Sequence, residues 1–97
     1  MSKRPFCGLC LLCVLCAGFA VTVPLAIRED AYRANNRGVA LLEQFRPGEA
    51  AEAFRQALRT DPGLAIARVN LAIALFNIPD LPGAEREARA AAQALPD

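Results

Sequence analysis

The chain has 97 residues with 11 basic and 10 acidic side chains, a formal net charge of +1, and room for one small domain at most. Residues 28–97 hold nine Arg and ten acidic residues, hence a net charge of −1, which gives no electrostatic case for nucleic acid as a partner. There is no His or Trp, the only Ser is Ser2, and all four Cys lie between residues 7 and 16, so we expect neither an enzyme, nor a cofactor, nor a metal site in residues 28–97.

The N-terminal part, residues 1–27, is predicted to anchor the chain in a membrane. Residues 6–27 form an uncharged run of 22 residues behind Lys3 and Arg4. About 20 helical residues cross a hydrocarbon core of about 30 Å, so this run is long enough to span one. We expect Pro24 to kink or end that helix near its far side. A cleaved secretory signal is the alternative, because Gly18 and Ala20 offer small residues at the spacing that a signal peptidase needs.

The basic residues around this run bear on its orientation. Lys3 and Arg4 favour a cytoplasmic N-terminus, although Arg28, Arg33 and Arg37 follow the run closely. We predict a single-pass membrane protein in which residues 28–97 lie outside the cytoplasm. Signal cleavage would instead give a secreted or periplasmic protein.

Four cysteines recur every third residue inside the apolar run, at Cys7, Cys10, Cys13 and Cys16. On a helix this spacing spreads the thiols over half the circumference, so four of them do not converge on one metal. We interpret them as small apolar residues of a membrane span. Acylation of Cys7 and a metal or redox role are the alternatives.

Residues 28–97 are predicted to be entirely helical. The first helix is expected to have Asp30 as its N-cap, and others are expected over 47–60, 63–78 and 82–95, with Pro47 in the first turn of the second. Asp61 and Pro62 are expected to cap and open the third. Helical spacing defines an apolar set in each of three helices, namely Tyr32, Val39, Leu41, Leu42 and Phe45, then Ala50, Phe54, Ala57 and Leu58, and last Ala84, Ala88, Ala91 and Leu95. The charged residues Glu49, Glu52, Arg55 and Arg59 are placed on a solvated face.

The helical region repeats itself when the sequence is shifted by 34 positions. Aligning residues 31–63 with 65–97 gives eight identities in 33 pairs, most of them small, apolar or proline. In chain order the recurring pattern is Gly38, Leu41, Ala50, Phe54, Ala57 and Pro62, then Ala72, Leu75, Ala84, Ala88, Ala91 and Pro96. This pattern resembles the tetratricopeptide repeat, although Ala88 replaces an aromatic residue and Arg37 stands where Leu is usual. We therefore predict an all-α protein with two such helix hairpins, at about 31–64 and 65–97.

The resemblance implies a concave groove lined by the first helix of each hairpin. The residues mapped to partner binding are Tyr32, Asn35, Asn36, Val39, Ile66, Val69, Asn70, Ile73 and Phe76, with Leu42 beside them. Some family members grip a carboxylate with Lys and Arg from this surface, but the matching residues here are Asn35, Val39, Val69 and Ile73. We expect an apolar helix or strand, or another copy of the chain, as ligand. The alternative is that several of these residues are core.

Repeat arrays bury their faces between neighbours, and about three repeats are usually needed for stability. We expect Ala88, Ala91 and Leu95 to be partly uncovered, so that a longer array, a second copy or a partner completes the fold. The predicted function is membrane-tethered protein–protein interaction, with a scaffold or assembly role. The alternatives are the leading segment of a larger, possibly enzymatic, repeat protein, and a secreted soluble repeat protein.

Overall fold

The computed structural model describes residues 24–95, and this part of the chain is entirely helical. Its four helices are α2 (Leu25–Glu43), α3 (Pro47–Thr60), α4 (Ala65–Asn77) and α5 (Leu81–Ala94). The predicted all-α class is confirmed for these residues. No helix among them is both long enough and apolar enough to cross a bilayer. All but the last four residues of the predicted span, and the four cysteines, lie outside the described range.

The 34-residue period of the sequence is also a period of the structure. Helix α3 begins at Pro47 and ends at Thr60, and α5 begins at Leu81 and ends at Ala94, so both ends of α5 lie one full period after those of α3. The first helices of the two hairpins end at Glu43 and Asn77, which are separated by the same period. The four helices therefore form two helix hairpins in register with the sequence repeat.

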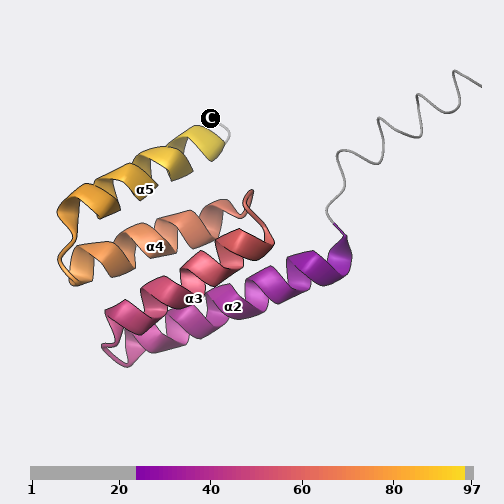
Figure 1. Ribbon diagram of the computed structural model, residues 1–97, viewed down its shortest axis with the longest axis horizontal. Coiled ribbons are helices and arrows are strands. Elements are labelled where there is room, and N and C mark those ends of the chain that lie inside the picture. Colours follow the sequence, from indigo (N-terminus) through magenta and orange to yellow (C-terminus); the bar gives the residue numbers. More distant parts are fainter. Residues whose placement is uncertain (1–23, 96–97) are drawn as a thin grey trace, which may run out of the picture.

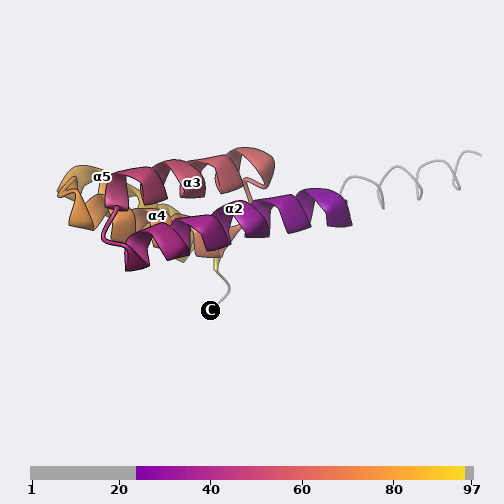
Figure 2. The ribbon, with the colours of Figure 1, turned by 90° about the horizontal axis from the view of Figure 1, so that it is seen from below.

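The hairpins lie side by side, and α4 is the central helix. Figure 1 shows α4 between α5 and the α2–α3 pair, and Figure 2, seen from below, shows α3 above α2. Helix α4 contacts α2, α3 and α5, whereas α5 packs on α4 alone. One long side of α5, and the α4 face beside it, therefore has no helix of the described residues against it.

The core is rich in alanine, which lets the helices approach closely. Phe54 on α3 is the only large side chain in the described range that is completely buried. It belongs to a cluster of buried residues together with Ala50, Ala51, Leu71, Ala74, Leu75 and Ala84. A second cluster, nearer to the α3–α4 turn, consists of Ala31, Ala34, Ala57, Leu64 and Ala67. Glu49, Glu52, Arg55 and Arg59 are exposed, as predicted.

The start of the first helix differs from the prediction. Helix α2 begins at Leu25 and has Pro24 at its N-cap, so the prediction that Asp30 caps it is wrong. No residue between Leu25 and Asp30 breaks a helix, and Asp30 lies within α2, where its carboxylate is 3.8 Å from the Arg33 guanidinium. The last three residues of the predicted anchor segment thus belong to α2.

Two turns also differ from the prediction. The Asp61 side chain accepts a hydrogen bond from the Gly63 N–H at 3.1 Å, which closes a turn, and α4 begins only at Ala65. Asp61 therefore does not cap α4, and Pro62 is not part of it. Phe45, expected on the apolar face of the first helix, lies beyond the end of that helix and is 92% exposed.

Candidate functional site

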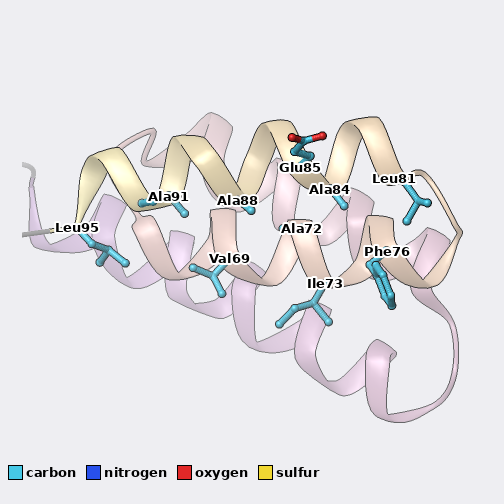
Figure 3. Close-up of a pocket in the computed structure, with 11 residues that line it drawn as sticks. Val69, Ala72, Ile73, Phe76, Leu81, Ala84, Glu85, Ala88, Ala91 and Leu95 are labelled. Carbon is cyan, nitrogen blue, oxygen red and sulfur yellow. The ribbon is translucent and has the colours of Figure 1, made fainter.

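An open apolar groove runs between α4 and α5 (Figure 3). Its volume is about 630 Å³, within the range of about 300–1,000 Å³ that is usual for ligand pockets. The lining residues are Val69, Ala72, Ile73, Phe76, Leu81, Ala84, Glu85, Ala88, Ala91, Ala92 and Leu95. Glu85 is the one charged residue in this set.

The spacing of the helices determines which residues form the groove. Val69, Ile73 and Phe76 are four and three residues apart on α4, so they share one face of that helix. Small residues occupy the facing side of α5, at Ala84, Ala88 and Ala91. Leu81 and Leu95 lie at the two ends of the groove in Figure 3. The groove therefore has bulky apolar side chains on its α4 wall and at its two ends, and alanine residues on its α5 wall.

The bulky side chains of the groove are open to solvent. Ile73 is 46%, Phe76 63%, Leu81 56% and Leu95 50% exposed. Scattered exposed apolar residues are normal, but a contiguous group of them indicates a binding surface. With one carboxylate and no other titratable side chain among its lining residues, the groove is suited to burying apolar surface rather than to transferring protons.

Polar contacts hold the two walls in place from outside the groove. The Arg68 guanidinium on α4 lies 3.3 Å from the Glu87 carboxylate on α5, and both side chains are largely buried. Arg68 also donates to the Pro62 carbonyl at 3.2 Å. At the start of α5 the Asp80 carboxylate accepts a hydrogen bond from the Gly83 N–H at 3.0 Å, an N-cap that the sequence analysis missed.

The structure brings together three of the residues predicted to bind a partner. Val69, Ile73 and Phe76 line the groove. Tyr32, Asn36 and Ile66 are exposed elsewhere, and Val39 is half-buried against the core. Asn35 is buried, and its Oδ1 accepts a hydrogen bond from Asn70 Nδ2 at 2.9 Å, which ties α2 to α4.

The α5 side of the groove was predicted only in part. Ala88 and Leu95 are exposed, as expected, but Ala91 is buried, so the expectation that it is uncovered is wrong. The lining roles of Ala72 and Leu81 were missed. The 34-residue alignment is the sequence signal that bears on them, because it pairs Ala72 with Gly38 and Leu81 with Pro47 of the first hairpin.

One comparison with known proteins gives a match, and that match covers the first hairpin. The tetratricopeptide repeat family matches residues 31–64, which comprise most of α2, all of α3 and the turn after it. Comparison with curated proteins and with solved structures gives no match. The match to the first hairpin and the four helices fit a tetratricopeptide-like fold, a class of repeat that generally mediates protein–protein interaction.

Proposed function

We propose that this protein is a membrane-tethered interaction module, with a scaffold or assembly role, which binds an apolar segment of a partner protein in the α4–α5 groove. The observation that carries this proposal is the groove itself, where four large apolar side chains are each roughly half exposed. Val69, Ile73 and Phe76 belong both to this groove and to the concave binding surface predicted from the sequence.

The exposed apolar side chains of the groove supply part of the free energy of binding. Full burial of a large apolar side chain contributes about 1.5–3 kcal/mol relative to full exposure. Four half-exposed side chains therefore supply on the order of 3–6 kcal/mol, before the entropic cost of association and apart from contacts at the rim. Contacts of the partner with the alanine residues of the groove and with its rim must supply the rest, because association costs at least about 4 kcal/mol.

The tether is proposed from the sequence of residues 6–27, which has 22 uncharged residues behind Lys3 and Arg4. A single span with the helices outside the cytoplasm would place the groove where it meets proteins of the envelope or cell surface. Cleavage within this stretch would release the same module as a secreted or periplasmic protein.

Replacement of Val69, Ile73 and Phe76 by alanine tests the proposal. The partner is first captured by photo-crosslinking in the native cells with the full chain as bait. Capture should be lost in the triple variant, because the α4 wall of the groove is removed while the core residues Leu71, Ala74 and Leu75 are kept. Alanine at Tyr32 and Ile66, which are exposed outside the groove, is the matched control. Unchanged capture by a folded triple variant would contradict the proposal.

A further inference from the structure

The first hairpin shows what covers a groove of this kind. Shifting each lining residue back by 34 positions gives its counterpart on α2 and α3 or at their ends. These counterparts include Asn35 and Gly38 on α2 and Ala50, Phe54 and Ala57 on α3. Every one of them is buried or half-buried. The equivalent face of the first hairpin is therefore occupied, whereas no helix among residues 24–95 covers that of the second hairpin.

The helix that occupies the first face is α4. It contacts both α2 and α3, and its own buried residues belong to the same two core clusters as Ala50, Phe54 and Ala57. With the residue just before the helix, these buried positions are Leu64, Ala67, Leu71, Ala74 and Leu75. Their spacings of three, four, three and one mark a narrow apolar stripe of alternating small and large residues.

We infer that the α4–α5 groove binds one amphipathic helix of a partner protein, and that this helix carries the small-and-large apolar stripe of α4. This inference rests on the proposed function and names the chemistry of the partner. The groove is formed by the residues 34 positions after those of the α2–α3 face on which α4 packs. A helix with the apolar spacing of α4 therefore fits the groove in the same way.

The outer side of α2 in a second copy of this chain is not suited to that site. The α2 residues aligned with the buried stripe of α4 are Asp30, Arg33, Arg37, Ala40 and Leu41. Arg33 and Arg37 stand where Ala67 and Leu71 are buried, and placing two guanidinium groups in an apolar groove without partners is costly. The exposed side of α3 also carries charged residues, among them Glu52 and Arg55.

One difference between the two faces bears on the partner's side chains. In the first hairpin the Phe54 ring fills the centre of the face, whereas the aligned residue of the second hairpin is Ala88, which is exposed. The α4–α5 groove is thus hollow at its centre. Its partner helix has room for a bulkier apolar residue there than α4 presents to Phe54.

A designed peptide tests the inference without knowledge of the partner. The probe is a fluorescent helical peptide, four turns long, that carries the five stripe residues of α4 on a Glu and Lys background. The control peptide is the same sequence with Ala67→Arg and Leu71→Arg, the two residue types that α2 carries at these positions. Binding to the full chain in lipid nanodiscs is measured by fluorescence anisotropy. We expect the probe to bind at least tenfold more tightly than the control.

Two variants of the protein locate the binding site. Ile66 and Ile73 both lie on α4 and are 45% and 46% exposed, but only Ile73 lines the groove. Ile73→Asp should weaken probe binding at least tenfold, and Ile66→Asp should leave it unchanged. Equal binding of both peptides, or equal effects of both variants, would overturn the inference.

The remaining outcomes separate this inference from the proposed function. If the triple alanine variant loses its cellular partner while the probe fails to bind, the interaction role stands and the assignment of an α4-like helix is wrong. Native mass spectrometry of the nanodiscs addresses self-association. A dimer that Ile73→Asp dissociates would make a second copy the occupant of the groove and would overturn the assignment of a different protein.

Discussion

One pair of residues in contact differs in size between the interiors of the first and second hairpins. Gly38 on α2 has no Cβ, and the Phe54 ring occupies the space that a Cβ would need. A Cβ built at Gly38 would lie 2.7 Å from two carbons of that ring, well inside ordinary van der Waals contact. The aligned pair in the second hairpin is Ala72 and Ala88, so a small residue has been enlarged and the aromatic ring lost.

We predict that Gly38→Ala lowers the free energy of unfolding by about 1–2 kcal/mol. Overpacking against the buried ring costs about 1–3 kcal/mol, and the better helix propensity of alanine offsets up to about 1 kcal/mol of it. Denaturant unfolding of the full chain in detergent micelles, followed by circular dichroism, measures the difference.

Gly48→Ala is the matched control for this prediction. Gly48 lies in the first turn of α3, and a Cβ there meets nothing within 4 Å. This variant should be unchanged or slightly more stable. A Gly38→Ala protein as stable as Gly48→Ala would show that the ring shifts freely and that the core around it is loosely packed.

At the scale of the helix, the end of α2 stands out because Phe45 has a φ of 59°. The Arg46 N–H bonds to the Leu41 carbonyl and the Phe45 N–H to the Leu42 carbonyl, both at 3.0 Å, which is the pattern of a Schellman motif. Glycine is the usual residue at the left-handed position of this motif. The left-handed backbone costs a residue with a side chain about 1–2 kcal/mol.

Phe45→Gly is therefore expected to raise the free energy of unfolding by about 1 kcal/mol. The ring is 92% exposed, so its removal sacrifices little burial. Phe45→Ala separates the two effects, because it removes the ring but keeps the backbone cost, and it should give no gain. The same denaturant titration measures both variants, and an equal stability change in the two would contradict the backbone explanation.

The helices themselves could be predicted from the sequence more fully than their ends. Apolar periodicity and Pro47 predicted α3 at its observed bounds, 47–60. The other ends shifted because short polar side chains compete for several roles. Asp61 closes a turn with Gly63 and Asp80 caps α5, although each is an aspartate beside a proline-containing turn. Which role an aspartate takes depends on the backbone path that follows, and composition does not fix that path.

At the scale of the molecule, the two ends of the helix stack differ in chemistry. Along the outer side of α2 the residues aligned with the buried stripe of α4 include Asp30, Arg33 and Arg37. At the other end, α4 and α5 present Ile73, Phe76, Leu81 and Leu95. One end is therefore suited to water and the other to a further helix. This asymmetry disfavours open-ended stacking of identical copies and leaves one face for a partner.

The residues on the α4 side of the candidate site could be predicted from the sequence, but the location of the groove could not. The pattern along the chain identified Val69, Ile73 and Phe76, because they repeat on one face of one helix. It did not distinguish a concave surface made of first helices from a groove between α4 and α5, since that choice depends on which face α4 turns toward α2 and α3. The buried Asn35–Asn70 hydrogen bond is one consequence of that orientation.

The most direct test of the central claim, that the α4–α5 groove is a helix-binding site, is to supply the helix in the same chain. Residues 64–80 are duplicated after Asp97, which continues the 34-residue period, and the unfolding temperature is measured by circular dichroism in detergent micelles. A control extension carries Arg in the duplicated positions of Ala67 and Leu71. We predict a rise of at least about 5 °C for the first extension and none for the control, since about 1 kcal/mol shifts the unfolding of a domain this size by about 4–8 °C. Equal unfolding temperatures for the two extended chains would contradict the claim.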